Sequence, residues 1–403
     1  MNTSDFIRLH RGDDVRALAL QAARYPDVDM PFALRQIQGW QIARKKIPTW
    51  AKYEEIVYPP HLNMEQCSSE QTARYKASLF EYHPDKTMAD LTGGLGVDFS
   101  FLSQRFGKAL YVERDPQLCA ISSGNFNVLQ LSGVVATCDN CETFLQTMPA
   151  VDLLYIDPAR RNHSGARTFA IADCTPDLLR LLPTMLEKAS GILVKLSPML
   201  DISKTVADLN NAADRKGRVT RVHVVSVRNE CKELLVEMTR ADRPDDDYEL
   251  VLVNDSQTIR LQARKAVAGS LSLPEAEDFV WLYEPNVSIL KAGCTSYVAE
   301  RHHVKPVSGN SHLCVARKLD RSFPGRFFSI TGISTMNKRS LKTLLQGIDR
   351  ANVAVRNFPL TADQLRKQLH LKDGGDDYLF GTTLADGSRV VIACHSAPAV
   401  IVS

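Results

Sequence analysis

The chain has 403 residues, of which 44% are hydrophobic and 24% are charged, with 49 Lys and Arg against 46 Asp and Glu. These are ordinary values for a globular protein, and they exclude a mostly disordered, fibrous or membrane-spanning chain. At a typical size of roughly 150 residues per domain, the length predicts two to four domains. The net charge of +3 indicates a nucleic-acid partner only if the basic residues are clustered.

The first residues contain no apolar core of the kind that a secretory signal needs, because charged side chains are spread through them. No run approaches the roughly 18 apolar residues that span a bilayer. Nine cysteines at scattered spacings predict reduced, packed thiols. We therefore expect a cytoplasmic protein without a membrane partner. Cys138 and Cys141 have chelating spacing, but they lack a second pair, so no metal is expected and half-buried thiols are the better interpretation.

Apolar residues recur at three- and four-residue steps from Asp13 to about Lys86, which predicts helices that prolines divide into short pieces. From Thr87 to Arg240, short apolar runs alternate with amphipathic stretches. Strands are predicted at 88–91, 109–112, 134–136, 151–156 and 191–194, and helices at 98–104, 116–127, 141–146 and 175–188. This alternation predicts a parallel, doubly wound sheet.

The block ends in two strand-like runs, 221–227 and 233–238, joined by only five residues. That connection is too short for a helical crossover, so the two runs should pair antiparallel. Nicotinamide-binding sheets usually finish with another parallel unit instead. A polar segment, 241–247, follows and is a plausible domain boundary.

A glycine-rich loop, D-L-T-G-G-L-G-V-D from Asp90 to Asp98, follows the first predicted strand and opens a helix. Glycines let the backbone turn tightly and approach a ligand closely. A dinucleotide fingerprint that starts at Gly94 would need its third glycine at Phe99, which disfavours a nicotinamide cofactor. Taken alone, the loop is also explained as a tight strand-to-helix turn.

Acidic residues follow the next strands. Glu113 ends the second strand, where it could accept hydrogen bonds from both hydroxyls of a ribose, and Asp139 follows the third, where it could accept from an adenine amino group. The fourth strand ends in D-P-A-R-R from Asp157 to Arg161. Each acid alone could be a surface residue or a helix cap, but the ordered set favours an adenosyl cofactor at the carboxyl edge of the sheet.

The loop, the acids and the terminal hairpin resemble a class I S-adenosylmethionine-dependent methyltransferase over roughly residues 66–240. The resemblance implies a Rossmann-like α/β fold, with parallel strands closed by an antiparallel hairpin, and S-adenosylmethionine as cofactor. It implies that the loop surrounds the methionine part, that Glu113 binds the ribose and that Asp139 binds the adenine. The implied cofactor-binding residues are Asp90, Thr92, Gly93, Gly94, Gly96, Glu113, Arg114 and Asp139. The polar segment 66–73 either covers the cofactor or is a Ser-capped helix start.

Residues 157–160 resemble the D-P-P-Y and D-P-P-R motifs of methyltransferases that act on nucleobases, which implies catalytic roles for Asp157, Pro158 and Arg160. Asp157 could accept a hydrogen bond from a base amine or ring N–H. Ala159 replaces the second proline, and Arg160 stands where amino-methylating enzymes usually have an aromatic residue. Arg160 could stack on a base or clamp a phosphate instead.

Three basic residues are candidates for substrate binding. Arg160 and Arg161 lie in one loop with His163 and Arg167, a composition that suits a polyanionic substrate. Lys195 ends the fifth strand on the same edge of the sheet and could contact the substrate, but the favoured interpretation is a solvated strand-end lysine.

Basic residues are clustered between 301 and 342, where Asp320 is the one acid set against Arg301, Lys305, Arg317, Lys318, Arg321, Arg326, Lys338, Arg339 and Lys342. Phe323, Phe327 and Phe328 lie among them. This pattern is typical of an RNA-binding surface, although a solvated face over buried phenylalanines also produces it. Residues 351–360, with 365–366 and 373–375, resemble the THUMP-like domain attached to some bacterial methyltransferases, which implies a link to RNA, chiefly tRNA.

The predicted domains are a helical segment (1–70), the methyltransferase domain (71–240), a small α+β domain for which a ferredoxin-like fold is one option (248–320) and a THUMP-like α+β domain (321–403) that reads β-α-β-α-β-β over 327–396. The leading hypothesis is a methyltransferase that modifies a nucleobase in structured RNA, either tRNA or rRNA. The alternatives are a catalytically silent RNA-binding protein with a methyltransferase fold, and a protein or small-molecule methyltransferase. The sequence indicates no oligomeric state.

Overall fold

The computed structural model describes residues 1–160, 171–240, 247–266 and 272–396. Contacts between Cα atoms divide the chain into two compact units. The first unit comprises Met1–Arg221 with Leu234–Asp245, and the second comprises Val222–Glu233 with Asp246–Ser403. The four domain boundaries expected from the sequence stay predictions.

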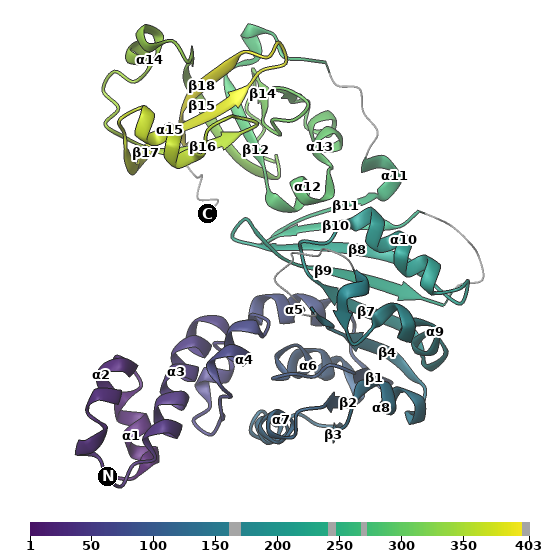
Figure 1. Cartoon of the computed structure of the whole chain (residues 1–403). Helices are drawn as coiled ribbons and strands as arrows, with labels where there is room; N and C mark the ends of the chain where they lie inside the picture. The colour runs from purple at the N-terminus through teal and green to yellow at the C-terminus, as the bar shows by residue number, and fades with distance from the viewer. Residues whose placement is uncertain (161–170, 241–246, 267–271, 397–403) are drawn as a thin grey trace. The chain divides into compact units, whose positions relative to one another are not determined.

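The first unit begins with short helices that proline-containing turns interrupt, as the sequence predicts (Figure 1). They are α1 (Thr3–His10), α2 (Val15–Leu20), η1 (Ala22–Arg24), α3 (Met30–Lys46), η2 (Trp50–Lys52), α4 (His61–Gln66) and α5 (Glu70–Ser78). Trp50 and Tyr58 lie in one buried cluster with Val97 and Phe101 of α6 (Val97–Leu102). The helical segment therefore packs directly against the domain that follows it.

The central sheet has nine strands in the order β11-β10-β8-β9-β7-β4-β1-β2-β3. Their bounds are β1 (His83–Asp90), β2 (Phe106–Glu113), β3 (Val134–Cys138), β4 (Val151–Ile156), β7 (Ala189–Leu196), β8 (Arg218–Val227), β9 (Glu230–Thr239), β10 (Glu249–Asn254) and β11 (Gln257–Gln262). The strand pairs β1–β2, β2–β3, β1–β4 and β4–β7 are parallel. The prediction of a parallel α/β sheet is confirmed.

The predicted hairpin is also confirmed. β8 and β9 are joined by two residues, Arg228 and Asn229, whose φ angles of 51° and 57° turn the chain sharply. β9 returns between β8 and β7 and runs antiparallel to β7. The sheet does not end there, because β10 and β11 extend it beyond β8 as a second antiparallel pair.

Helices cover both faces of this sheet, with α6 and α7 on one face and α8, α9 and α10 on the other (Figure 1). The remaining helices are η3 (Ser103–Arg105), α7 (Pro116–Val128), α8 (Cys141–Thr147), η4 (Ile171–Asp173), α9 (Leu178–Lys188) and α10 (Ile202–Ala212). Side chains cap their starts: Asp115 accepts from the amides of the first turn of α7, and Asp177 does the same for α9. The sequence predicted that this helix begins at residue 175. It begins at Leu178 instead, because Asp177 caps it. A short ribbon, β5 (Ala159–Arg160) with β6 (Cys174–Thr175), follows β4.

The second unit contains a seven-stranded sheet in the order β13-β14-β12-β15-β18-β17-β16. Its elements are α11 (Ala263–Ala266), η5 (Ala276–Asp278), β12 (Trp281–Pro285), α12 (Val287–Ala292), α13 (Thr295–Arg301), β13 (Lys305–Pro306), β14 (Cys314–Ala316), β15 (Gly325–Thr335), α14 (Lys338–Leu344), β16 (Arg350–Arg356), α15 (Ala362–Gln368), β17 (Lys372–Thr383) and β18 (Arg389–Ser396). The last six elements have the predicted order β-α-β-α-β-β.

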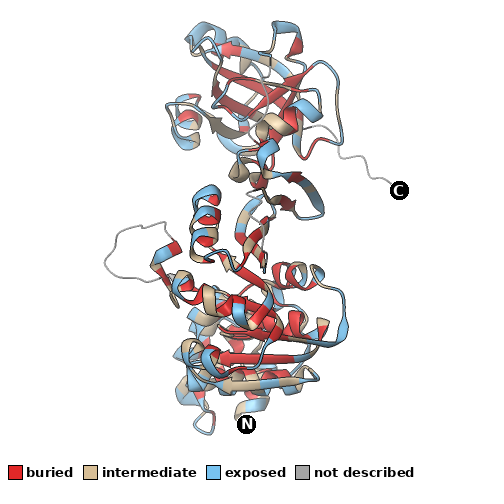
Figure 2. Ribbon diagram, turned by 90° about the vertical axis from the view of Figure 1, so that its right-hand side faces the viewer, coloured by how far each residue is buried: buried red, intermediate tan, exposed pale blue. Residues whose placement is uncertain are grey.

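Alternate residues of the inner strands of the second sheet enter different cores. Phe380 and Ile392 belong to one buried cluster, whereas their chain neighbours Leu379 and Val391 belong to another. Figure 2 shows buried residues concentrated along the strands of both sheets. Among the described residues, no helix is long and apolar enough to cross a membrane.

Candidate functional site

A cleft of about 310 Å³ lies at the carboxyl edge of the parallel strands in the first unit. Asp90 and Glu113 are the last residues of β1 and β2, Asp139 and Asp157 follow β3 and β4 closely, and Lys195 lies one residue before the end of β7. All the residues predicted to bind a cofactor line the cleft, and Asp157 and Lys195 line it too. The fold therefore brings together residues as distant in the chain as Asp90 and Lys195.

The three loop glycines serve two different purposes. A Cβ at Gly93 would lie 2.1 Å from the ring of Tyr111, and a Cβ at Gly96 would lie 2.5 Å from the ring of Phe126. These two glycines are required by packing. Gly94 has a φ of +55°, and the nearest atom to its Cβ position would be the Thr92 carbonyl oxygen at 3.8 Å. The expected role of glycine in close ligand approach therefore fits Gly94 alone.

Glu113 ties the glycine loop to the start of α7. Its Oε2 accepts a hydrogen bond from the Gly94 amide at 2.8 Å, and its Oε1 accepts one from the Asp115 amide at 2.9 Å. Each carboxylate oxygen can accept a second hydrogen bond. The half-buried Glu113 can therefore hold the loop in place and still accept from the hydroxyls of a ligand.

Asp139 and Arg114 also line the cleft. Asp139 Oδ1 accepts a hydrogen bond from the Asn140 amide at 2.7 Å, and Asn140 in turn caps α8. Arg114 is exposed and lines the cleft beside Glu113. Asn140 is thus the cap of α8, and the half-buried Asp139 is not.

Asp90 lies beneath the loop with only 1% of its surface exposed. Burial raises the pKa of this carboxyl well above its usual range, and the neighbouring carboxylates Asp98, Asp157 and Glu113 raise it further, against the lowering effect of the Thr92 amide. The Thr92 amide donates to Asp90 Oδ1 at 2.9 Å. Because the Thr92 hydroxyl also accepts from the Asp157 amide at 2.7 Å, Thr92 links the loops that follow β1 and β4.

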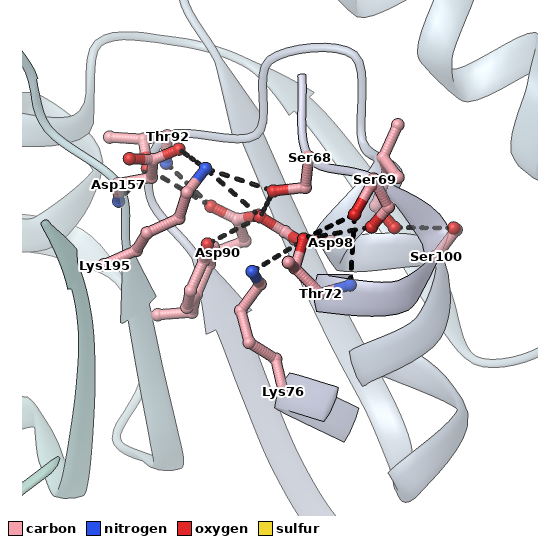
Figure 3. A network of polar contacts seen from close by, with 12 residues as sticks. Ser68, Ser69, Thr72, Lys76, Asp90, Thr92, Asp98, Ser100, Asp157 and Lys195 are labelled. Atoms are coloured by element: carbon pink, nitrogen blue, oxygen red, sulfur yellow. Dashed lines mark hydrogen bonds and ion pairs between the residues drawn. The ribbon is translucent and has the colours of Figure 1, made fainter. Parts of the chain in front are cut away.

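A network of ion pairs and hydrogen bonds forms the inner wall of the cleft (Figure 3). Lys195 Nζ lies 2.6 Å from Asp157 Oδ2, 3.1 Å from Ser68 Oγ and 3.6 Å from Asp98 Oδ2. Its side chain is only 15% exposed. The interpretation of Lys195 as a solvated strand-end lysine is therefore wrong.

The polar segment 66–73 contains the predicted helix cap, and other residues of it line the cleft. Ser69 caps α5 by accepting from the Thr72 amide at 3.3 Å. Gln66, Cys67 and Ser68 line the cleft instead. The segment thus places polar side chains in the cleft and starts the next helix.

The loop predicted to meet the acceptor is described only in part. Pro158 is buried, and its neighbour Ala159 lines the cleft. The Arg160 backbone lies in β5, paired with Cys174 of β6, but its side chain falls outside the described part of the structure. Arg161, with His163 and Arg167, also lies outside the described residues. The substrate roles of Arg160 and Arg161 stay predictions.

Sequence reasoning misses Asp98, which contacts Lys195, and Lys76, which pairs with Asp98. In the sequence, Asp98 is only the last residue of the glycine motif. Lys76 is wholly buried, next to Ala73 and Ala77 on the inner face of α5. A lysine at an apolar position of a helix is the sequence feature that could have identified Lys76, because a buried lysine needs a partner.

Cys138 is exposed and Cys141 is half-buried. No group of three or more His, Cys, Asp or Glu side chains able to hold a metal ion occurs within the described ranges.

In the second unit, acidic residues from outside the segment 301–342 form ion pairs with some of its basic residues. Lys305 lies 2.8 Å from Asp278, and Arg317 pairs with Glu277. Glu284, 1% exposed at its side chain, pairs with both Arg326 and Arg356. The exposed basic residues without an ion pair in the described structure include Lys318, Arg321, Lys338, Arg339 and Lys342. The cluster predicted from the sequence is thus partly neutralised.

Comparison with known proteins agrees with this architecture. Residues 281–324 match the model of a ferredoxin-like domain, and residues 325–396 match the model of a THUMP domain-like family. The crystal structure of a putative methyltransferase from Porphyromonas gingivalis W83 is 30% identical in sequence, with a TM-score of 0.86 and 98% of each chain covered. The chain belongs to this family of methyltransferase-like proteins with a THUMP-like C-terminal domain. The resemblance predicted from the sequence is confirmed.

Two further solved structures match part of the chain with low TM-scores. A putative methyltransferase from Streptococcus mutans, in complex with SAH, is 14% identical, with a TM-score of 0.31 over 43% of this chain and 97% of its own. An rRNA methylase from Streptococcus thermophilus is 13% identical, with a TM-score of 0.32 over 42% of this chain and 94% of its own. No curated protein matches the chain.

Proposed function

We propose that the protein is an S-adenosylmethionine-dependent methyltransferase that modifies a nucleobase in structured RNA. The observation that carries the proposal is the convergence of the glycine loop, Glu113, Asp139 and Asp157 on one cleft at the carboxyl edge of a parallel sheet. Open α/β sheets bind ligands at this edge. Family membership supports the reaction class, because the relative with 98% coverage bears a methyltransferase name.

The residues present fit the cofactor. At Gly94 a Cβ would occupy otherwise open space in the wall of the cleft, so the backbone there can approach a ligand closely. Glu113 has spare acceptor capacity for the ribose hydroxyls, and Asp139 has it for the adenine amino group. S-adenosylmethionine supplies a methyl group activated by its sulfonium.

For the acceptor, Asp157 is the group best placed to take a proton. Its Oδ2 is bound by Lys195, and its side chain is 36% exposed, so a nucleobase could reach the carboxylate. Asp157 would accept a hydrogen bond from the acceptor N–H and orient the nitrogen lone pair. It would receive the proton that the nitrogen loses as the nitrogen–carbon bond forms and the carbon–sulfur bond breaks, which leaves S-adenosylhomocysteine. Lys195 would hold the carboxylate in that position.

RNA as the substrate class rests on the second unit. The THUMP domain-like match covers 325–396, and exposed basic residues remain at 318–321 and 338–342 after the ion pairs are counted. Phosphate contacts of such residues would give binding a strong dependence on salt.

Calorimetry with S-adenosylmethionine tests the foundation of the proposal. Glu113→Ala removes the acceptors expected for the ribose, and a hydrogen bond to a charged group contributes about 1.5–3 kcal/mol, so affinity should fall by more than about tenfold. Glu187→Ala, which removes an exposed carboxylate from the same unit, is the matched control and should bind like the wild type. Equal affinity in both variants, or no binding by the wild type, would remove the basis of the proposal.

Radiolabelled methyl transfer tests the substrate class. RNA extracted from a strain without the gene should accept label from the wild-type protein, and nucleoside analysis should then show one methylated base. Cofactor binding without transfer to any RNA would favour a catalytically silent RNA-binding protein. Transfer to protein or to small molecules alone would favour the third hypothesis.

A further inference from the structure

The carboxylate of Asp98 joins four elements of the first unit around one point (Figure 3). Its Oδ2 accepts from Ser68 Oγ at 2.7 Å and from the Tyr155 hydroxyl at 2.8 Å, and it lies 3.6 Å from Lys195 Nζ. Its Oδ1 lies 3.2 Å from Lys76 Nζ. The contacts come from the segment before α5, from β4, from β7 and from α5 itself. They converge at the first turn of α6, which the glycine loop opens.

Asp98 carries a charge although it is buried. Burial favours its neutral form, but Lys76 and Lys195, with the Ser68 and Tyr155 hydroxyls, outweigh burial and lower the pKa of the carboxyl. Lys76 is 0% exposed, and Asp98 is 9% exposed. A charge pair as enclosed as this one is costly to desolvate and is weak evidence for stability, which leaves room for another role.

Lys195 is the link between Asp98 and the acceptor side of the cleft. A lysine stem has four rotatable bonds, and a lysine near a strand end would ordinarily extend into water. Here the ammonium lies between Asp98 and Asp157, with Ser68 as a third contact. These partners hold the ammonium in one position against Asp157.

We propose that Asp98 is a positioning residue, which fixes Lys195 and through it the carboxylate of Asp157, while the buried Lys76 holds Asp98 in place. The catalytic consequence rests on the proposed function; the placement of Lys195 does not. Because Ser68 lines the cleft and contacts both Asp98 and Lys195, the same network joins the segment before α5 to the acceptor side.

The test uses the full chain with the double variant Lys76→Met/Asp98→Asn. This variant removes one buried positive and one buried negative charge together, so it avoids the large cost of stranding a single buried charge. Met fills the space of the lysine stem, and Asn keeps an oxygen for Ser68 or Tyr155. Lys216→Met/Glu187→Gln is the control, since it removes an exposed ion pair of 2.7 Å from the same unit.

The first measurement needs no turnover. Reductive methylation followed by mass spectrometry should label Lys195 several-fold faster in the Lys76→Met/Asp98→Asn variant than in the wild type or the control, because the ammonium has lost a buried carboxylate partner. Ser68→Ala, which adds and removes no charge, should raise the rate of labelling too and serves if the double variant does not fold. Labelling of Lys195 at the wild-type rate in the folded variants would overturn the proposal.

The second measurement separates positioning from general structural support. The double variant should bind S-adenosylmethionine within about twofold of the wild type, while kcat for RNA methylation falls between about 10- and 100-fold. An unchanged kcat with faster labelling would refute the catalytic part. If the wild type neither binds the cofactor nor turns over, the proposed function fails, yet the labelling result still decides whether Asp98 positions Lys195.

Discussion

Alanine substitutions at the adjacent glycines Gly93 and Gly94 should differ in their effect on ligand binding. At Gly93, a Cβ would lie 2.1 Å from the ring of Tyr111, a residue with 0% exposure. The ring cannot move aside, because it packs against Phe99 and Phe126 at centroid distances of 5.3 and 5.0 Å and its hydroxyl donates to the Gly94 carbonyl. Gly93→Ala should therefore lower the free energy of unfolding by at least about 1–3 kcal/mol, as overpacking of a core does.

Gly94→Ala should lower the affinity for the cofactor in addition to its cost in stability. Its φ of +55° makes alanine cost about 1–2 kcal/mol, but no atom lies within 3.8 Å of the new Cβ. The added methyl group would occupy the wall of the cleft, so affinity for S-adenosylmethionine should fall at least about tenfold, or 1.4 kcal/mol. Urea unfolding and calorimetry on both variants measure the two quantities. Wild-type affinity in Gly94→Ala, or wild-type stability in Gly93→Ala, would refute the division of roles within the loop.

Two further predictions concern charge. Asp90→Asn should raise the free energy of unfolding at neutral pH. Because the pKa of Asp90 is raised, the folded state binds its proton more tightly than the unfolded chain does, and the wild type loses stability as the pH rises from about 4 through the folded-state pKa. The gain should vanish in urea titrations near pH 4, and a gain that is independent of pH would contradict this account. For RNA binding, removing Lys338, Arg339 and Lys342 together should reduce the slope of log K against log salt by about two to three, whereas Lys305→Met should leave it nearly unchanged because Lys305 is paired with Asp278. Equal slopes in all variants would place the phosphate contacts elsewhere.

Much of the fold could be predicted from the sequence because it depends on local patterns. The five parallel strands follow from short apolar runs, and the antiparallel hairpin follows from a connection too short for a crossover. The extension of this sheet by β10 and β11 could not be predicted. An apolar run at 250–253 indicates a strand but not the sheet to which it belongs, because pairing depends on contacts distant in the sequence.

The candidate site could likewise be predicted only in part from the sequence. The ends of the strands can be located from the apolar runs, so the sequence predicts that Asp90, Glu113, Asp139 and Asp157 share one edge of the sheet, and the cleft contains all of them. Asp98 could not be assigned in this way, because its partners come from α5, from β4, from β7 and from the segment before α5. The packing roles of Gly93 and Gly96 could not be predicted either, because the aromatic rings beneath them belong to β2 and α7.

Charge counted along the chain overstates the basic surface of the second unit. Between 301 and 342 the sequence sets Asp320 alone against nine basic residues, but Glu277, Asp278 and Glu284 lie just before that window and pair with Lys305, Arg317 and Arg326. An ammonium or guanidinium that is paired with a carboxylate attracts a phosphate less strongly than an unpaired one, because the two opposite charges partly cancel. Electrostatic attraction of RNA should therefore depend on Arg301 and on two short stretches, 318–321 and 338–342, and not on the whole window. The salt dependence of variants in these stretches is consequently a sharper test of an RNA partner than the net charge of the chain.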